Sequence, residues 1–372
     1  MTSELGIGVL GLGSAGARHA RTIAAGAVPG AFLAAVCDPI AERRSGFDAF
    51  GASDAEELLK RPDVGAVVVA TPHRTHVELG IAAIRAGRHV LMEKPLGVHK
   101  AECERVVAAH RAAHAAGLTF GVVHDYRAHP RFQWLRAQLN RGDLGRVERV
   151  VWQATDWYRT HAYYRGSSWR GRYASEGGGL LVNQLPHLFD TLIWLFGAPR
   201  KVLGQCRFGR FHEVEVEDDV TALIDFAGGH SAVVVASTGE SPGTNRLEVS
   251  CDRGRIVLED GAALVHRSRE ASSSHRRRES SGRPLADVER LEFPARAATG
   301  LALLTNFVAA IAGREPLLAP AEQAIAAVET ANAVLWSSLL GRALTLPIDA
   351  EAFEGVLAEL SASGAATALG SG

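Results

Sequence analysis

The stretch GLGSAG, which follows the apolar run LGIGVL near the start of the chain, constrains the fold more than any other feature. It places Gly11, Gly13 and Gly16 at G-x-G-x-x-G spacing, ahead of a helix-like segment. The next apolar run, AFLAAVCD, ends in Asp38. Glycines between a strand and a helix, with an acidic residue ending the next strand, indicate a dinucleotide-binding β-α-β unit rather than an ordinary turn.

Each glycine has a distinct expected role. Gly11 permits a tight turn, Gly13 lets the backbone approach a pyrophosphate, and Gly16 lets the helix pack closely on the strand. The helix N-terminus, at Ser14 and Ala15, offers unpaired N–H groups to the phosphates. The motif therefore predicts that all five residues bind the cofactor.

Asp38 indicates which dinucleotide is bound. Its carboxylate can accept hydrogen bonds from both hydroxyls of the adenosine ribose and would repel a 2′-phosphate. We therefore expect NAD to be preferred over NADP, with Arg43 and Arg44 nearby able to soften that preference.

The pattern of apolar runs changes near residue 123. Before it, apolar strands without polar alternation are separated by helices, which predicts a doubly wound parallel sheet covered on both faces. After it, strands at hairpin spacing such as VTALIDF flank a long helix-like run, GGGLLVNQLPHLFDTLIWLFG, and two late helices follow. We predict an α/β chain with a dinucleotide-binding domain (1–123), an α+β domain built on a large, mostly antiparallel sheet with one open face (124–348), and a C-terminal helix and tail (349–372).

Composition narrows the class of protein. A formal net charge of -1 over 372 residues gives no global field for nucleic acid or an anionic membrane. No apolar run is long enough to span a bilayer, and the first residues do not resemble a signal peptide. The four cysteines are scattered, which argues against a disulfide framework and favours the cytoplasm.

Two histidine pairs, His73 with His76 and His110 with His114, have spacings that a metal could use. No third ligand is evident beside either pair, so we expect no metal. The basic segment 266–284 lacks aromatic residues to stack bases. We interpret it as a solvated loop, the alternative being a phosphate- or nucleic-acid-binding patch.

Lys94 is unusual because the chain has only four lysines among its 40 basic residues, the other 36 being arginine. It lies in HVLMEKPLG, directly after a predicted strand and before Pro95, which fixes the backbone. A desolvated lysine can release its proton, whereas a guanidinium stays protonated. We expect Lys94 to handle a substrate proton, the alternative being a surface charge at a strand end.

The long helix-like run carries three polar residues, Asn183, His187 and Asp190, that would share one face of a single helix. Pro186 should kink that helix or remove one backbone bond. His187 suits reversible proton transfer, although a histidine in an apolar helix can also be a satisfied core residue.

The segment TDWYRTHAYYRGSSWRG, residues 155–171, concentrates aromatic and basic residues ahead of the glycines. Aromatic faces with arginine between them suit a sugar ring, whereas core packing of a long loop is the alternative for any one ring. The predicted substrate contacts here and after the last strand of the first domain are Asp156, Tyr158, Tyr163, His124, Tyr126 and Arg127.

Three further segments, ATPHRTH, EKPL and EGGGLLVNQLPHLFD, resemble the glucose–fructose oxidoreductase/inositol dehydrogenase/rhizopine-catabolism (Gfo/Idh/MocA) family in order and spacing. The resemblance runs from the first strand to about residue 348. It implies a Rossmann domain, a nicotinamide cofactor, sugar or polyol substrates, and a homodimer or homotetramer formed through the open sheet face.

The resemblance also implies individual roles. Lys94 would contact the reacting hydroxyl, and His187 would be the general acid/base. Asn183 stands where many members carry aspartate, so we assign it to substrate positioning. The residues implied to border the cofactor are Ala70, Thr71, Pro72, His73, His76, Glu93, Lys94, Trp169 and Arg170.

The predicted function is an NAD(P)-dependent dehydrogenase or ketoreductase acting on a sugar, glycoside or cyclitol. One alternative keeps NAD bound and uses transient oxidation for elimination, epimerisation or glycoside cleavage. Another is a non-catalytic sugar or NAD sensor. The presence of both Lys94 and His187 argues against the sensor, which has no need of a proton-transfer pair.

Overall fold

The structure is a computed structural model that describes residues 4–113, 116–278, 281–294 and 297–363. The chain forms two compact units, each described here by itself. The first unit comprises Met1–Ala128, Ser175–Gly177 and Ala298–Val328. The second comprises His129–Ala174, Gly178–Ala297 and Glu329–Gly372.

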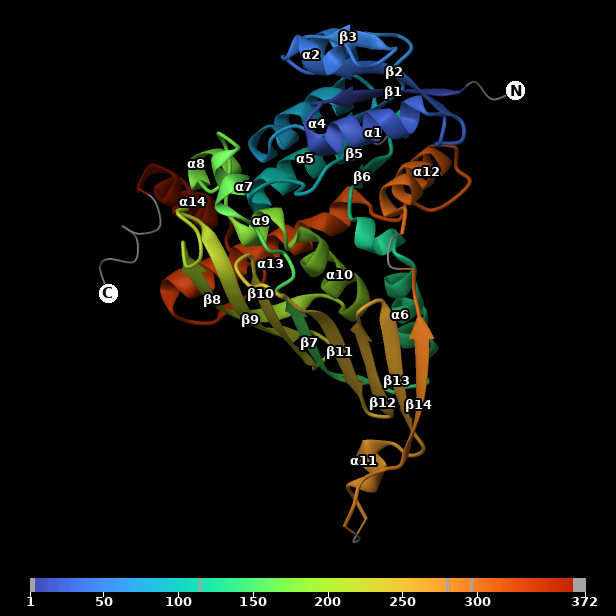
Figure 1. Cartoon of the computed structure of the whole chain (residues 1–372), viewed down its shortest axis with the longest axis vertical. Coiled ribbons are helices and arrows are strands. Elements are labelled where there is room, and N and C mark those ends of the chain that lie inside the picture. Colours follow the sequence, from blue (N-terminus) through green and yellow to red (C-terminus); the bar gives the residue numbers. More distant parts are fainter. Residues whose placement is uncertain (1–3, 114–115, 279–280, 295–296, 364–372) are drawn as a thin grey trace. The chain divides into compact units, whose positions relative to one another are not determined.

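The first unit is built on a six-stranded parallel sheet with the order β3-β2-β1-β4-β5-β6 (Figure 1). Its strands are β1 (Leu5–Leu10), β2 (Ala31–Cys37), β3 (Phe50–Ala52), β4 (Ala66–Val69), β5 (His89–Met92) and β6 (Phe120–Val122). Its helices are α1 (Ser14–Ala24), α2 (Ala41–Arg44), α3 (Ala55–Leu59), α4 (His76–Arg85), α5 (Lys100–Ala112) and α12 (Thr299–Ile311), with short 3-10 helices η1 (His73–Thr75) and η3 (Asp125–Ala128). This order confirms the predicted doubly wound sheet.

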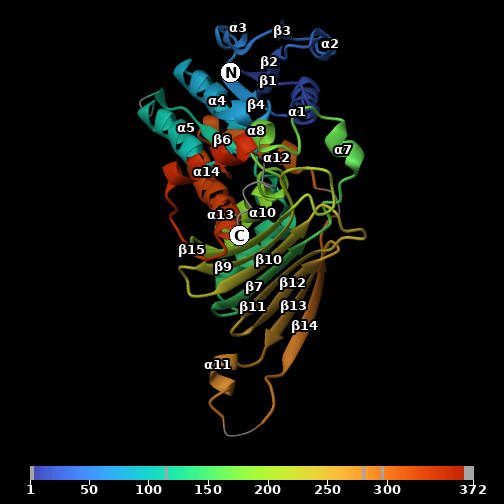
Figure 2. The ribbon, with the colours of Figure 1, turned by 90° about the vertical axis from the view of Figure 1, so that its left-hand side faces the viewer.

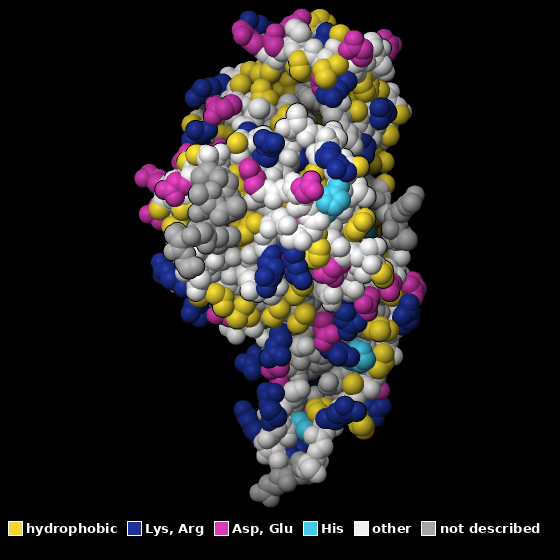
Figure 3. Space-filling model, turned by 60° about the vertical axis from the view of Figure 1, so that its left-hand side comes forward, with side chains coloured by type: hydrophobic (Ala, Val, Ile, Leu, Met, Phe, Trp, Pro, Cys, Tyr) yellow, Lys and Arg dark blue, Asp and Glu magenta, His cyan; other side chains and the backbone are white. Residues whose placement is uncertain are grey.

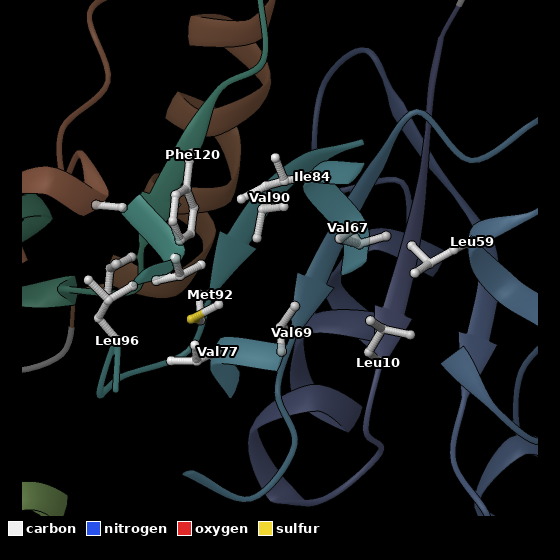
Figure 4. Close-up of a cluster of buried hydrophobic side chains, with 14 of the residues drawn as sticks. Leu10, Leu59, Val67, Val69, Val77, Ile84, Val90, Met92, Leu96 and Phe120 are labelled. Carbon is white, nitrogen blue, oxygen red and sulfur yellow. The ribbon is translucent and has the colours of Figure 1, made fainter. Parts of the chain in front are cut away.

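Both faces of this sheet are buried, as the uninterrupted apolar strands predict. In β4, Val67 and Val69 point to the face covered by α3, α4 and α5, whereas Ala66 and Val68 point to the face covered by α1 and α12. The first of these two cores is shown in Figure 4. Because successive side chains of a strand alternate between faces, a strand buried on both sides needs an apolar residue at every position.

Residues 298–328 depart from the predicted domain boundaries, because they belong to the first unit and not to the second. The reason is the apolar stripe of α12, whose Leu303, Leu304 and Phe307 are buried in the core with Ile7 and Val9 of β1. The next helix, α13 (Ala321–Leu340), begins in the first unit and continues in the second.

The second unit is built on a nine-stranded sheet with the order β14-β13-β12-β11-β7-β10-β9-β8-β15. Most of its strands are labelled in Figure 2. Every pair is antiparallel except β7 with β10. The strands are β7 (Val147–Ala154), β8 (Pro199–Phe208), β9 (Glu217–Phe226), β10 (Ser231–Ser237), β11 (Asn245–Cys251), β12 (Gly254–Glu259), β13 (Ala262–Ser268), β14 (Ala286–Glu292) and β15 (Leu344–Thr345). The predicted mostly antiparallel sheet is confirmed.

One face of this sheet is covered and the other is open. Ala222, Ile224 and Phe226 of β9 are buried, whereas Leu223 between them is exposed, as are Leu203 of β8 and Val151 of β7. The helices of this unit are α6 (Pro130–Arg141), α7 (His161–Arg165), α8 (Tyr173–Glu176, which reaches the boundary between the units), α9 (Leu180–Asn183), α10 (Pro186–Phe196), α11 (Ser272–His275) and α14 (Ala350–Ser363). No helix of the described residues is long and apolar enough to cross a membrane.

The predicted single helix through Asn183 and His187 is wrong, because the chain forms two helices there. α9 ends at Asn183, and α10 begins at Pro186, which occupies the first turn. Proline lacks an N–H and is favoured at the start of a helix, so it begins α10 instead of kinking one long helix. Asn183 is therefore the last residue of α9, and His187 lies in the first turn of α10.

The basic segment 266–284 forms the end of the β13–β14 hairpin and includes α11. Lys and Arg side chains are prominent at this end of the molecule in Figure 3. Several of these arginines pair with carboxylates: Arg269 with Asp287 at 2.8 Å, and Arg278 with Glu270 at 2.9 Å. Residues 279 and 280 of the segment lie outside the described residues, as does His114.

Candidate functional site

The glycine turn has the geometry that a dinucleotide requires. Gly11 has a φ of +86°, and a Cβ there would lie 2.7 Å from the carbonyl oxygen of Ala70. A Cβ on Gly16 would lie 1.8 Å from the carbonyl oxygen of Gly11, so helix and strand pack without room for a side chain. A Cβ on Gly13 would meet nothing within 4 Å. The turn is therefore closed behind the motif and open at Gly13, where a pyrophosphate would approach.

The N-terminus of α1 is available to an anion. Gly13 is its N-cap, no side chain in the described structure caps it, and its first turn contains no acidic residue. Gly13 and Ser14 are exposed and Ala15 is half-buried. Unpaired N–H groups and the positive end of the helix dipole are thus presented at the carboxyl edge of the sheet.

Asp38 is held rigidly at the end of β2. Its Oδ2 accepts a hydrogen bond from the N–H of Leu12 at 2.8 Å, and its Oδ1 accepts one from Ile40 at 3.0 Å. The guanidinium of Arg43 lies 3.3 Å from Oδ2. Burial alone would raise the pKa of Asp38, but the hydrogen bonds from Ile40, Leu12 and Arg43 hold that pKa below its usual range. Asp38 is therefore a carboxylate at neutral pH.

The loop after β4 begins at the same edge of the sheet. The N–H of Ala70 donates to the carbonyl of Leu10, which joins this loop to the strand before the glycine turn. Thr71 is half-buried and Pro72 is exposed, whereas the ring of His73 is buried with Nδ1 3.2 Å from the carbonyl oxygen of Glu176. Ala70 and Thr71 thus lie beside Gly11, and the contact of this loop with the cofactor stays a prediction.

The Lys94 turn follows β5 and is fixed through Glu93. The Oε1 atom of Glu93 lies 2.7 Å from Nε2 of His19 on α1, and both side chains are almost fully buried. The other carboxylate oxygen accepts a hydrogen bond from the N–H of Lys94 at 3.2 Å. The peptide bond between Lys94 and Pro95 is cis, and the Lys94 side chain is half-buried.

His76 holds the same turn from the other side. Its Nδ1 lies 2.8 Å from the carbonyl oxygen of Pro95 and its Nε2 lies 2.8 Å from that of Thr71. Burial lowers the pKa of this histidine. Both ring nitrogens face backbone, so His76 joins the loop after β4 to the Lys94 turn and its ring has no nitrogen left for the predicted cofactor contact.

In the second unit, Glu217 organises the glycine run ahead of α9. Its Oε1 accepts hydrogen bonds from the N–H groups of Gly179 at 2.8 Å and Leu181 at 3.0 Å. Its Oε2 accepts one from the hydroxyl of Tyr173 at 2.9 Å. Burial raises the pKa of Glu217 despite these hydrogen bonds. The carboxyl group therefore fixes the start of α9, the short helix that ends at Asn183.

Asn183 is brought together with one residue of the predicted substrate wall. Its Nδ2 donates to the hydroxyl of Tyr163 at 3.4 Å. His187 lies in the first turn of α10, half-buried, and its carbonyl accepts a hydrogen bond from the hydroxyl of Thr191 at 2.7 Å. Asn183 and His187 thus flank the break between the two helices.

The remaining predicted substrate residues have varied surroundings. Tyr158 is 50% exposed, and Asp156 is exposed and accepts a hydrogen bond from Asn245 at 3.1 Å. Arg127 is only 2% exposed and donates to the carbonyl of Leu318 at 3.0 Å, so it supports the first unit internally. His124 is buried and Tyr126 is half-buried, both in the first unit.

Lys94 belongs to the first unit and His187 to the second, so their joint action remains a prediction. The part of the chain that the structure describes contains no group of three or more His, Cys, Asp or Glu residues arranged to hold a metal ion.

Sequence reasoning missed two residues of these sites: His19 and Glu217. A signal existed for His19, which lies three residues after Gly16 on the face of α1 that also carries Ala20 and Ile23. A buried polar residue on that face needs a partner. No local pattern marks Glu217, because its partners are far away in sequence.

This fold and glycine turn define a dinucleotide-binding protein, and comparison with known proteins agrees. Residues 5–122 match the model of the oxidoreductase family with an NAD-binding Rossmann fold, and residues 132–257 match the GFO/IDH/MocA C-terminal domain. The chain belongs to the Gfo/Idh/MocA family.

Individual relatives cover the chain in part. Trans-1,2-dihydrobenzene-1,2-diol dehydrogenase of Bos taurus is 33% identical over 208 residues, which are 55% of this chain and 58% of that protein. Levoglucosan dehydrogenase of Pseudarthrobacter phenanthrenivorans is 27% identical over 296 residues, 68% of this chain and 73% of that protein. An oxidoreductase domain protein from Kribbella flavida has a solved structure that superposes with a TM-score of 0.80 at 24% identity, covering 93% of this chain and 100% of that one, which supports the fold.

Proposed function

We propose that this protein is an NAD-dependent dehydrogenase or ketoreductase acting on a secondary alcohol, or the matching ketone, of a sugar, glycoside or cyclitol. The observation that carries the proposal is the Lys94 turn, which two buried histidines fix at the carboxyl edge of the sheet. Ligands of doubly wound sheets bind at this edge. The two relatives described above are named for a cyclic diol and for levoglucosan, which agrees with this substrate class.

Lys94 is suited to hold the oxygen that loses its proton. A dinucleotide whose pyrophosphate is held at the glycine turn would supply a hydride acceptor for the alcohol carbon, and the hydroxyl proton must then leave. The amine of Lys94 can hydrogen-bond that oxygen and take up the proton, which an arginine in its place could not do.

We assign His187 to proton exchange and Asn183 to substrate orientation. An imidazole changes charge near neutral pH, whereas an amide carries no charge and supplies only hydrogen bonds. Asn183→Ala should therefore raise KM at least as much as it lowers kcat. Steady-state kinetics test this, and a large loss of kcat at unchanged KM would refute the assignment.

NAD should be preferred over NADP because Asp38 is ionised and fixed beside the glycine turn. A 2′-phosphate placed against this carboxylate would meet like-charge repulsion. Arg43, 3.3 Å from Asp38 and half-exposed, reduces this repulsion without removing it.

We further propose a homodimer or homotetramer formed through the open face of the nine-stranded sheet, where Leu203, Leu223 and Val151 are exposed. A cytoplasmic location fits the four cysteines, all of which are free and buried.

The direct test is absorbance of NADH on mixing the protein with NAD or NADP and a panel of sugars, glycosides and cyclitols. We expect at least one compound to produce NADH, with NAD more effective than NADP. Consumption of a compound with no NADH formed would contradict a net dehydrogenase, and no turnover of any member would contradict the activity altogether.

A further inference from the structure

The segment 157–172, WYRTHAYYRGSSWRGR, is strongly basic in a chain that is close to neutral. It contains four arginines, Arg159, Arg165, Arg170 and Arg172, and no aspartate or glutamate. Such a local excess of positive charge is costly unless an anion offsets it. The segment lies wholly in the second unit.

Two of these arginines lie against one aromatic ring. The guanidinium carbon of Arg170 is 4.2 Å from the ring centroid of Tyr163, and that of Arg159 is 4.9 Å from the same centroid. Trp169 lies 5.0 Å from Arg170, and Trp157 lies 5.7 Å from Arg159. Stacking on rings restricts both guanidiniums while leaving their N–H edges free to donate.

Neither guanidinium has a carboxylate partner within the described residues. The side chain of Arg159 donates to the carbonyl of Tyr158 at 2.9 Å. The Nε atoms of both Arg159 and Arg170 are buried and have no hydrogen-bond partner in the described structure. Buried donors without a protein partner are rare in folded proteins, and each one calls for a physical explanation.

The position of Arg159 is fixed by the core of its own unit. Its N–H donates to the carbonyl of Thr238 at 2.8 Å, and its carbonyl oxygen lies 3.0 Å from Nε2 of His212. His212 is in turn held by the fully buried Asp218, 3.0 Å from its Nδ1. The backbone of Arg159 is therefore anchored to the core of the second unit.

This pair of arginines lies next to the predicted substrate residue Asn183. The ring that both guanidiniums contact belongs to Tyr163, and its hydroxyl accepts the hydrogen bond from Asn183. An anion bound between the guanidiniums would be separated from the Asn183 amide, which we assign to substrate orientation, only by the side chain of Tyr163.

We propose that Arg159, together with Arg170, binds an oxyanion carried by the substrate, so that the natural substrate is an acidic sugar or cyclitol and not a neutral one. Arg170 would then contact the substrate and not the cofactor that the family resemblance implies for it. The inference rests on the proposed function, because it names the class of compound that the same site accepts. A carboxylate or a phosphate ester could supply the oxyanion, since guanidiniums bind both.

The test compares matched neutral and acidic ligands on wild-type protein, Arg159→Gln and the control Arg165→Gln. Arg165 is exposed in the same segment. Dissociation constants would be measured by calorimetry, with NADH present, for aldohexoses, their uronates and their 6-phosphates, with kcat/KM measured in parallel. We expect wild type and Arg165→Gln to bind one acidic series at least about 10-fold more tightly than its neutral parent, and Arg159→Gln to lose about 10- to 100-fold of that affinity.

The outcomes separate this inference from the proposed function. Tight binding of an acidic ligand that depends on Arg159, without NADH formation, would support the inference and contradict the proposed dehydrogenase. Turnover of neutral sugars with no preference for acidic ones would support the proposed dehydrogenase and contradict the inference. If Arg159→Gln weakens NADH binding while binding of acidic sugars is unchanged, the pair serves the dinucleotide phosphates and the inference is wrong.

Discussion

Glu93 and His19 form a buried contact, with Oε1 of the glutamate 2.7 Å from Nε2 of the histidine. The contact joins the helix that follows the glycine turn to the residue that precedes Lys94. Because the second oxygen of Glu93 accepts the N–H of Lys94, His19 helps to fix the backbone that carries the lysine.

Removing His19 should therefore affect catalysis at a distance. His19→Ala removes the imidazole from the buried Glu93 carboxylate, which should cost about 1–3 kcal/mol of unfolding free energy and lower kcat more than it raises KM for NAD. His19→Gln, whose amide can still donate to Glu93, should recover much of both losses. Urea unfolding and steady-state kinetics are the measurements, with Arg21→Ala, on the exposed side of α1, as the control. Equal loss in the Ala and Gln variants would show that the hydrogen bond is not what matters.

Alanine substitutions at Gly13 and Gly16 should affect different properties, cofactor binding in the first case and stability in the second. Gly16→Ala places a Cβ against the backbone oxygen of Gly11, which cannot move aside, and should destabilise the fold by about 1–3 kcal/mol. Gly13→Ala meets nothing in the protein and should leave stability nearly unchanged while weakening NAD binding by about 10-fold or more. Thermal unfolding without NAD and calorimetric titration with NAD distinguish the two. A Gly13→Ala protein with unchanged NAD affinity would place the pyrophosphate elsewhere.

Glu217 predicts a dependence of stability on pH. Its pKa is raised by burial in the folded protein, so the folded state holds this proton more tightly than the unfolded state. The resulting stabilisation is complete below the ordinary glutamate pKa and is lost as pH rises through the raised value. In Glu217→Gln the amide oxygen can keep the bonds from Gly179 and Leu181, and the Tyr173 hydroxyl can turn to accept from the new N–H group. Urea unfolding from pH 4 upward should show this loss of stability in wild type and not in Glu217→Gln. If the free energy of unfolding changes with pH in the same way in both proteins, Glu217 is not its cause.

We expect substitution of Asp38 to change the preference between NAD and NADP. Asp38→Ser removes the fixed carboxylate and leaves Arg43 without its partner, so NADP affinity should rise relative to NAD by about 10-fold or more. Separate dissociation constants for NADH and NADPH measure the ratio in both proteins. An unchanged ratio would mean that Asp38 acts only on the backbone N–H groups of Leu12 and Ile40.

Much of the first unit could be predicted because its signals are local. The glycine motif, the uninterrupted apolar strands and Asp38 at a strand end each depend on neighbours in sequence. The strand β3, which has only three residues, carries no periodicity from which to recognise it. The assignment of α12 to this unit also escaped prediction, since an apolar stripe shows that a helix packs but not on which sheet.

The candidate site was predictable as a list of residues but not as a set of contacts. Lys94 stands out by residue type, and Asn183 and His187 stand out as polar residues in an apolar run. Their support comes from His19, His76 and Glu217, whose partners are set by the tertiary fold. Pro186 was recognised as an interruption, but whether a proline kinks a helix or begins a new one depends on what the flanking turns pack against.

We propose that Lys94 is present for proton transfer and not for its positive charge. Lys94→Arg keeps the charge but cannot give up its proton, so we expect kcat to fall by about 100-fold or more with NAD affinity nearly unchanged. The measurement is the rate of NADH formation by wild type and Lys94→Arg with the best compound of the panel, alongside Lys60→Arg, an exposed control in the same unit. Wild-type turnover by Lys94→Arg would show that the lysine is not needed for proton transfer.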